Sequence, residues 1–211
     1  MIKYFNKYIK ESKHLDIDPY GEEDWNADDL PSLLQIAKKT DLPYDQIIQL
    51  DCFNNQLTSL EGIENLINLQ TLSCTFNQIR SLDGIENLIN LKYLNCSYNR
   101  LTNLVGIENL INLKHLNCSY NQLTNLVGIE NLINLKELWC YGNQLTNLNG
   151  IENLTNLQEL SCSNNQLTNL DGIENLINLK TLYCRNNSFP KEYKKYIRDY
   201  CRKKHIKLLL T

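Results

Sequence analysis

The stretch Leu113-Lys114-His115-Leu116-Asn117-Cys118-Ser119-Tyr120-Asn121 recurs, with changes, at a constant interval of 22 residues along most of the chain. Seven of the eight cysteines mark this interval: Cys52, Cys74, Cys96, Cys118, Cys140, Cys162 and Cys184. A fixed period of about 20–50 residues is the signature of a solenoid, in which each unit packs only against its neighbours. The 211 residues therefore predict one elongated body with end caps.

Each unit contains a short strand followed by a closing arm. Apolar and polar residues alternate in the strand, which places Leu116 and Cys118 on the buried face and His115, Asn117 and Ser119 on the other. One strand per unit gives a parallel sheet. After each strand, apolar residues recur every three positions, which suits tight 3₁₀-like turns. The asparagine that follows every strand, such as Asn121, can donate and accept hydrogen bonds at once, so we expect an inward-facing ladder.

The strand and its exit resemble the leucine-rich-repeat consensus LxxLxLxxNxL, with cysteine in the third apolar slot, over residues 47–187. The unit length resembles the short class of bacterial internalins and of leucine-rich-repeat regulators of phosphatases. The Asn- and Ile-rich, near-identical copies are similar in style to leucine-rich-repeat proteins of amoeba-infecting giant viruses. This resemblance implies an α/β, right-handed solenoid with a parallel sheet on the concave face, 3₁₀ or turn segments on the convex face and helical caps at both ends.

The departures from the repeat divide the chain into three parts. Residues 1–44 lack the repeat and contain helix-like stretches at 2–10 and 28–39, so we assign them to an N-terminal helical cap. Residues 45–188 form the array, with seven strands and about six full repeats. Residues 189–211 predict an amphipathic cap helix and then an edge strand. Ile206 lies 22 residues after Cys184, which predicts that this strand continues the same register as an eighth strand.

The cysteines favour packing over chemistry. Inward-facing cysteines stacked in register would have to distort the sheet to form a bridge, and a zinc site needs four ligands that converge tetrahedrally. The histidines, His14, His115 and His205, lie far apart in a linear array, and no phosphate loop, HExxH or serine elbow occurs. We therefore predict a non-enzymatic protein without catalytic residues, metal or cofactor. Reduced thiols fit a cytosolic compartment.

A comparison of two neighbouring repeats indicates where a ligand would bind. Residues 101–122 and 123–144 differ at only four places: His115 against Glu137, Asn117 against Trp139, Ser119 against Tyr141, and Tyr120 against Gly142. All four belong to the strand and its exit. Contact with a partner explains this placement, and drift at tolerant surface positions is the alternative. Exposed Trp and Tyr are enriched at binding hot spots. The predicted protein-binding residues on the concave face are Tyr93, Asn95, His115, Asn117, Glu137, Trp139, Tyr141, Tyr183 and Arg185.

Two further rows of side chains allow two interpretations each. Phe76, Tyr98 and Tyr120 precede the asparagine ladder and either pack along the rim of the coil or contact a partner. An isoleucine row, broken by Thr155, is either an exposed convex patch or a partly buried feature favoured by coding bias. The row consists of Ile67, Ile89, Ile111, Ile133 and Ile177.

We predict a protein-interaction module that binds a protein partner of unknown identity through the concave face. The alternatives are an assembly protein that self-associates through its ends or convex face, and an adaptor that recruits substrates to a host or cellular enzyme. The chain is expected to be monomeric, with weak end-to-end contact left open because acidic residues crowd residues 11–29 and basic ones residues 191–207. The aromatic residues of the basic segment fall on the apolar helical face, so nucleic-acid binding is not expected.

The sequence also bears on where the protein resides. No stretch reaches the roughly 18 apolar residues that span a bilayer, and residues 1–5 do not begin a continuous apolar region of the secretory type. We expect a soluble protein without membrane contact in the cytoplasm, which would be the host cytoplasm if the protein is viral.

Overall fold

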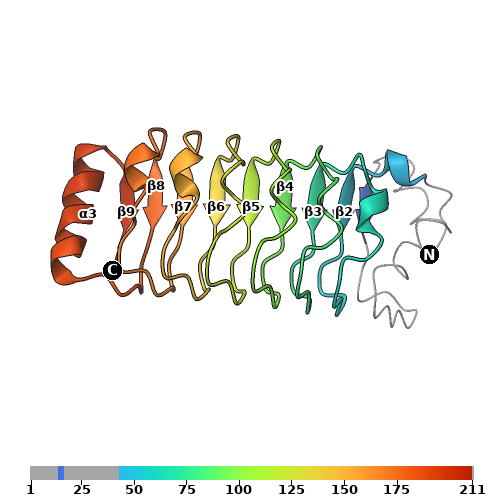
Figure 1. Ribbon diagram of the computed structural model, residues 1–211, viewed down its shortest axis with the longest axis horizontal. Coiled ribbons are helices and arrows are strands. Elements are labelled where there is room, and N and C mark those ends of the chain that lie inside the picture. Colours follow the sequence, from blue (N-terminus) through green and yellow to red (C-terminus); the bar gives the residue numbers. More distant parts are fainter. Residues whose placement is uncertain (1–13, 17–42, 211) are drawn as a thin grey trace.

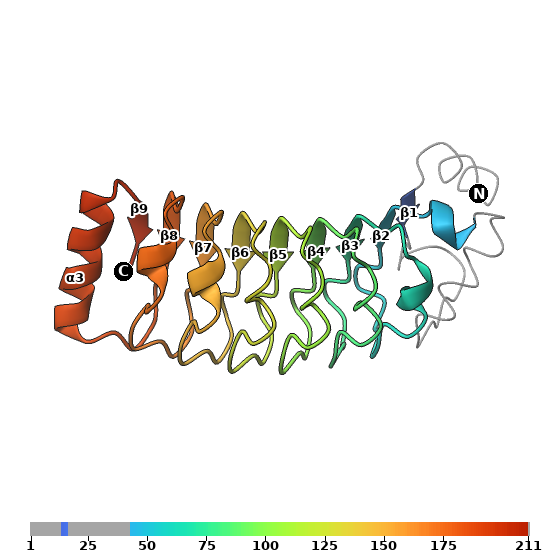
Figure 2. The ribbon, with the colours of Figure 1, turned by 45° about the horizontal axis from the view of Figure 1, so that its top comes forward.

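The computed structural model describes residues 14–16 and 43–210 of the chain. Its strands lie side by side along the longest axis of an elongated molecule (Figure 1; Figure 2). They form one parallel sheet of nine strands whose spatial order is the chain order, which confirms the expected solenoid. The strands are β1 (His14–Asp16), β2 (Gln49–Asp51), β3 (Thr71–Ser73), β4 (Tyr93–Asn95), β5 (His115–Asn117), β6 (Glu137–Trp139), β7 (Glu159–Ser161), β8 (Thr181–Tyr183) and β9 (Lys207–Leu209).

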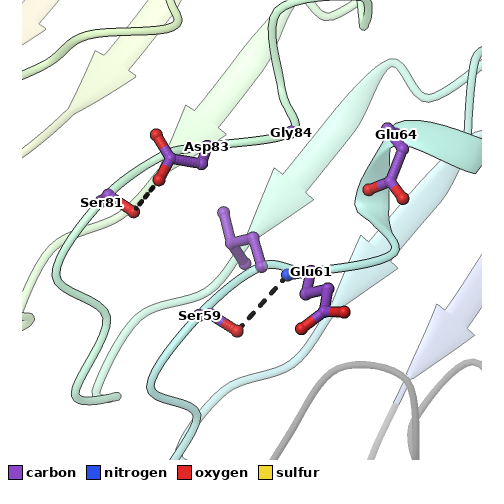
Figure 3. A pocket seen from close by; sticks show the side chains of 7 residues that line it. Ser59, Glu61, Glu64, Ser81, Asp83 and Gly84 are labelled. Carbon is purple, nitrogen blue, oxygen red and sulfur yellow. Dashed lines mark hydrogen bonds between the residues drawn. The ribbon is translucent and has the colours of Figure 1, made fainter.

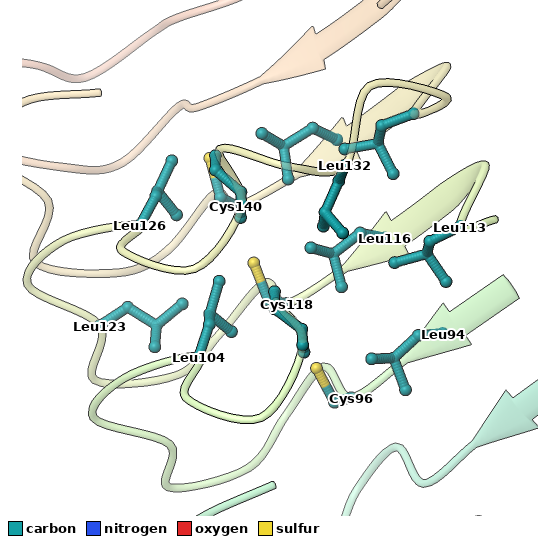
Figure 4. Close-up of a cluster of buried hydrophobic side chains, with 14 of the residues drawn as sticks. Leu94, Cys96, Leu104, Leu113, Leu116, Cys118, Leu123, Leu126, Leu132 and Cys140 are labelled. Atoms are coloured by element: carbon teal, nitrogen blue, oxygen red, sulfur yellow. The ribbon is translucent and has the colours of Figure 1, made fainter. Parts of the chain in front are cut away.

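The core is a set of aligned rows that run from coil to coil. The central leucine of each strand pairs in register with the next, as Leu94 with Leu116 and Leu116 with Leu138. Cys96, Cys118 and Cys140 follow one another beside these leucines (Figure 4) and are fully buried. Burying one Leu side chain contributes about 1.5–3 kcal/mol. Stacking of neighbouring coils, and not any single coil, therefore supplies the core.

The convex side consists of tight turns, as the three-residue spacing predicts. Four 3₁₀ segments occur in the described chain: η1 (Tyr44–Gln46), η2 (Ile63–Asn65), η3 (Ile151–Asn153) and η4 (Ile173–Asn175). The coils between η2 and η3 keep the same hydrogen bond from residue i+3 to residue i, for example from Leu110 N–H to the Ile107 carbonyl at 2.9 Å. The uniform bond explains why consecutive coils superpose and keep the strands in register.

The buried asparagines form the expected ladder. The Asn121 Oδ1 atom accepts a hydrogen bond from Leu101 N–H at 2.9 Å. Its Nδ2 atom donates to the carbonyl oxygens of Cys96 at 3.0 Å and of Cys118 at 3.1 Å. The same bonds recur at Asn99 and Asn143. Each side chain thus satisfies backbone groups of its own coil and of the preceding coil, which ties consecutive coils together.

The C-terminal end is closed by the expected helix, α3 (Lys191–Lys203), and by β9. The predicted register of this edge strand is wrong. Leu208 pairs with Leu182 of β8, so Leu210, and not Ile206, continues the cysteine line. Leu182 and Leu208 are 26 residues apart, whereas paired leucines of the array are 22 apart. The difference arises because the helix needs more residues than a turn.

The N-terminal end has a strand that the sequence analysis did not predict. β1 pairs in parallel with β2 and extends the sheet by one position. Leu15 lies 35 residues before its partner Leu50, so the 22-residue period of the array does not predict this strand. The helices expected at 2–10 and 28–39 lie outside the described residues, as does most of the acidic segment. The boundaries of the three parts of the chain stay predictions.

Candidate protein-binding surface

The concave face carries the outward side chains of each strand. In β5, the first and third residues, His115 and Asn117, are half-buried, and the central leucine is buried. β4 to β8 repeat this pattern at the outward positions, except that Ser161 of β7 is buried. The nine predicted binding residues lie on or directly after β4, β5, β6 and β8, and each is half-buried or exposed. Their side chains are therefore accessible from solvent, and their use in binding stays a prediction.

The centre of this face holds a polar cluster across β5, β6 and β7. His115 Nδ1 lies 3.0 Å from Glu137 Oε2, and both side chains are about one-third exposed. Trp139 Nε1 donates a hydrogen bond of 2.8 Å to Glu159 Oε1. Glu159 is not among the predicted binding residues, although it stands three residues before Cys162, in the same outward position that Glu137 has relative to Cys140. The bond to Glu159 fixes the direction of the indole.

The outward position predicted for Ser119 is wrong. Ser119 is fully buried, and its hydroxyl has no hydrogen-bond partner in the described part of the chain. The strand ends at Asn117, so the alternation no longer applies two residues later. Instead, the Asn117 side-chain oxygen accepts the Ser119 N–H at 3.1 Å, and Asn95 binds Ser97 N–H in the same way. The two asparagines therefore use their oxygens to shape the strand exit.

A row of aromatic rings runs along the rim where the strands end. Phe76 and Tyr98 stack with ring centroids 4.1 Å apart, and Tyr98 and Tyr120 with centroids 4.3 Å apart. Phe53 and Tyr141 close the two ends with edge-on contacts. The three central rings remain exposed. The rings therefore pack along the rim, and contact with a partner stays a prediction for their exposed parts.

Gly142 explains why two of the four repeat differences occur together. Its φ angle is +68°, and a Cβ atom there would lie 2.7 Å from Tyr120 Cδ1. A side chain at this position would have to displace the Tyr120 ring. Tyr141 supplies the terminal ring from the preceding residue instead, with centroids 5.0 Å apart. The Tyr141 and Gly142 pair is thus a packing unit at the end of the rim, separate from Glu137 and Trp139.

The isoleucine row is exposed. Its members have 50% to 79% of their surface accessible, and two valines, Val105 and Val127, are similarly exposed. The asparagine next to each isoleucine binds the backbone of the preceding coil, as Asn112 Nδ2 does with the Ile89 carbonyl at 2.9 Å. The row is therefore exposed, with about half of the surface buried at Ile67, Ile89, Ile111 and Ile133 and less at Ile177.

The cysteines have no free access to reagents. All eight are buried, free thiols. Burial raises the pKa of Cys96 and Cys184 to about 12 and that of Cys201 to about 11. Several thiols also donate weak hydrogen bonds to carbonyls of the next strand, as Cys96 Sγ does to the Asn117 oxygen at 3.4 Å. These groups stay protonated and do not act as nucleophiles at neutral pH.

A family model described as a leucine-rich repeat region matches residues 46–205, more than half of the chain. The chain belongs to the leucine-rich repeat family. Proteins with this fold commonly act as protein-interaction modules, which agrees with an accessible concave face. No curated protein sequence matches this leucine-rich repeat protein.

Solved leucine-rich repeat structures resemble it along most of the array. Internalin C2 of Listeria monocytogenes is 38% identical over 68% of this chain and 64% of its own, with a TM-score of 0.66. A leucine-rich repeat protein of Leptospira interrogans is 32% identical over 79% of this chain and 50% of its own, with a TM-score of 0.62. The ectodomain of a plant membrane receptor kinase from Arabidopsis thaliana, solved in complex with Casparian strip integrity factor 2, is 25% identical over 68% of this chain and 19% of its own, with a TM-score of 0.59. This leucine-rich repeat protein spans less than two thirds of the length of each.

The described residues of this leucine-rich repeat protein were also compared with what a metal site, a pocket or a membrane-spanning helix requires. No group of His, Cys, Asp and Glu side chains there is arranged to hold a metal ion. A shallow hollow of about 320 Å³ lies between two convex turns and is lined by Ser59, Leu60, Glu61, Glu64, Ser81, Asp83 and Gly84 (Figure 3). Its acidic groups do not converge on one point. None of the described helices has the length and apolar character that crossing a bilayer requires.

Proposed function

We propose that this leucine-rich repeat protein binds a protein partner through the concave face of β4 to β8, and that it acts by binding and not by catalysis. The observation that carries the proposal is the placement of repeat differences. Two adjacent repeats are identical except at the strand and its exit, and there Glu137 and Trp139 replace His115 and Asn117 on the concave face. The equivalent convex residues Val105 and Val127 are unchanged.

The chemistry of the surface supports this use. Trp139 and Tyr183 combine a large apolar area with a polar group, a combination enriched at binding hot spots. The related plant ectodomain was solved in complex with a partner, which supports binding as a use of the fold. The eight free thiols favour a reducing compartment, so we place the protein in the cytoplasm.

The chain itself supplies the variant that tests the proposal. The two changes Glu137→His and Trp139→Asn give β6 the outward residues of β5, which already form a strand in this array, and leave the rim residues Tyr141 and Gly142 unchanged. Partners captured from a native cell extract and quantified by mass spectrometry should fall at least tenfold with this variant. A drop of that size corresponds to about 1.4 kcal/mol of binding free energy.

The control is Val127→Asn, because Asn149 occupies the same convex position one coil later. It should leave capture unchanged. Equal capture by the wild type and the two-residue variant would show that the concave face of this repeat is not the binding surface.

The exposed isoleucine row favours a second candidate, self-association through the convex side. A contiguous apolar patch on a soluble protein often marks an interface. Light scattering coupled to size exclusion, at low and high salt, would detect it. A dimer that persists at high salt and is lost on Ile111→Asn would support this candidate, and a monomer at all concentrations would remove it.

A further inference from the structure

Two glutamates lie side by side on the concave side of β6 and β7. Glu137 and Glu159 are register partners on adjacent parallel strands, whose separation is about 4.8 Å. Like charges directly opposite one another destabilise a sheet. His115 of β5 contacts Glu137 from the side away from β7. In residues 43–210, no basic side chain lies within ion-pair distance of Glu159.

Each carboxylate has one oxygen engaged and one available. His115 contacts Glu137 Oε2, and the Trp139 indole N–H donates to Glu159 Oε1. The Glu137 Oε1 and Glu159 Oε2 atoms have no hydrogen-bond donor among the described residues. Each of these two neighbouring glutamates therefore keeps one oxygen able to accept a hydrogen bond from a bound molecule, and Trp139 lies beside them.

The indole provides a flat surface beside this pair. Its hydrogen bond to Glu159 carries the ring from β6 towards β7. Ser161, the register partner of Trp139, is buried, whereas Ser73 at the equivalent position of β3 is half-buried. We attribute the burial of Ser161 to its position between Trp139 and Tyr183, its register partners on both sides. Trp139 itself is half-buried, so part of the ring stays accessible.

We propose that Glu137, Glu159 and Trp139 form a site for an arginine side chain of the bound protein. This inference rests on the proposed function and specifies the chemistry of the partner. A guanidinium group is planar, stacks on an indole face and donates several hydrogen bonds in a fixed fork. It would bind the two available oxygens at once and remove the repulsion between the carboxylates.

Charge and shape both favour arginine over other side chains. A lysine ammonium supplies the charge as a compact point and lacks the planar fork. A neutral side chain would leave the negative charges of the two carboxylates without a positive partner. Lys136 precedes Glu137 in the chain, but no ion pair within the described residues joins it to either carboxylate. The partner segment is therefore basic at the point where it crosses β6 and β7.

The test uses the full chain, labelled with ¹⁵N, and three short probes. The probes are acetylated, amidated pentapeptides with arginine, lysine or citrulline between paired glycines. Citrulline keeps the shape of arginine without its charge. Addition of the arginine peptide should shift the NMR signal of the Trp139 indole N–H and saturate with a dissociation constant on the order of 1 mM. The lysine peptide should bind more weakly, and the citrulline peptide should not shift the signal.

Charge-neutral variants identify the carboxylates. Glu159→Gln keeps an oxygen that accepts the Trp139 N–H, so it removes the charge without releasing the indole. Glu159→Gln and Glu137→Gln should each weaken arginine-peptide binding about three- to fivefold, as expected for partly exposed ion pairs, and together at least tenfold. The control, Glu130→Gln, removes the same charge on the convex side, where the Glu130 side chain binds Gly128 N–H, and should change nothing.

Equal binding of the arginine and citrulline peptides, or unchanged binding after both substitutions, would overturn the arginine site. The peptide experiment and the capture experiment test the arginine site and the proposed function separately. If the arginine peptide does not bind but the two-residue concave variant still loses its captured partner, concave binding stands and only the arginine site is rejected. If that variant keeps its partner while the peptide binds as described, the site is real and the proposed binding surface needs revision.

Discussion

At the residue scale, each buried asparagine bonds to backbone groups of two consecutive coils. Asn121 satisfies Leu101 N–H and the carbonyls of Cys96, Cys118 and Ser119. Asn121→Ala would leave the Leu101 N–H and the Cys96 and Cys118 carbonyls without this partner, whereas the Ser119 carbonyl keeps its bond from Tyr98 N–H. Each buried group that loses its partner costs about 1–3 kcal/mol. We expect the free energy of unfolding, measured with urea, to fall by about 3 kcal/mol or more.

A matched surface change separates this effect from the loss of any asparagine. Asn131 is exposed, so Asn131→Ala should alter the unfolding free energy by less than about 0.5 kcal/mol. Asn121→Asp should not restore stability, because a carboxylate accepts hydrogen bonds but cannot donate to three carbonyls. If Asn121→Ala behaved like Asn131→Ala, the ladder would contribute nothing to stability.

At the scale of the strand and its turns, the sequence predicts most of what forms. The alternation of Leu116 and Cys118 with polar residues is a local rule, and it places the core and the concave face correctly. It fails at Ser119, where the strand has ended, and at β1, which lies outside the period. The contact of Tyr120 with Gly142 and that of Trp139 with Glu159 join residues of different coils. Such pairings depend on side-chain directions that spacing alone does not specify.

The terminal helix provides a test at the same scale. Ile197 of α3 is fully buried against the last coil, and Tyr200 donates a hydrogen bond of 3.2 Å to the Ile173 carbonyl. Ile197→Ala removes buried apolar volume, which costs about 2–5 kcal/mol. Because a solenoid coil contacts only its neighbours, the loss should be local. Hydrogen exchange should show β8 and β9 losing protection first, with β4 and β5 nearly unchanged.

Arg198→Ala, at the next residue and exposed, is the control for this substitution. It should leave exchange at β8 and β9 unchanged. A uniform loss of protection along all strands after Ile197→Ala would instead show that the array unfolds as one cooperative unit.

At the scale of the whole molecule, the buried cysteines should make the protein less stable at alkaline pH. Burial raises the pKa of every thiol above the ordinary value of about 8.5. Above that pH, the unfolded chain loses thiol protons that the folded chain keeps. The folded state then binds more protons than the unfolded state, so stability falls as pH rises. At neutral pH both states hold the protons, and the thiols have no such effect.

The size of this effect follows from the number of thiols. Each buried thiol lowers the free energy of unfolding by about 1.4 kcal/mol per pH unit once the pH exceeds the pKa of that thiol in the unfolded chain. For eight thiols, the loss over one pH unit is comparable to the entire free energy of unfolding of a typical domain, about 5–15 kcal/mol. We expect urea midpoints to be constant between pH 7 and 8 and to fall steeply above about pH 9. Replacing Cys140 and Cys162 with Ala should reduce the slope by about a quarter, since two of eight thiols are removed. An unchanged slope would mean that groups other than the buried thiols set the alkaline limit of this solenoid.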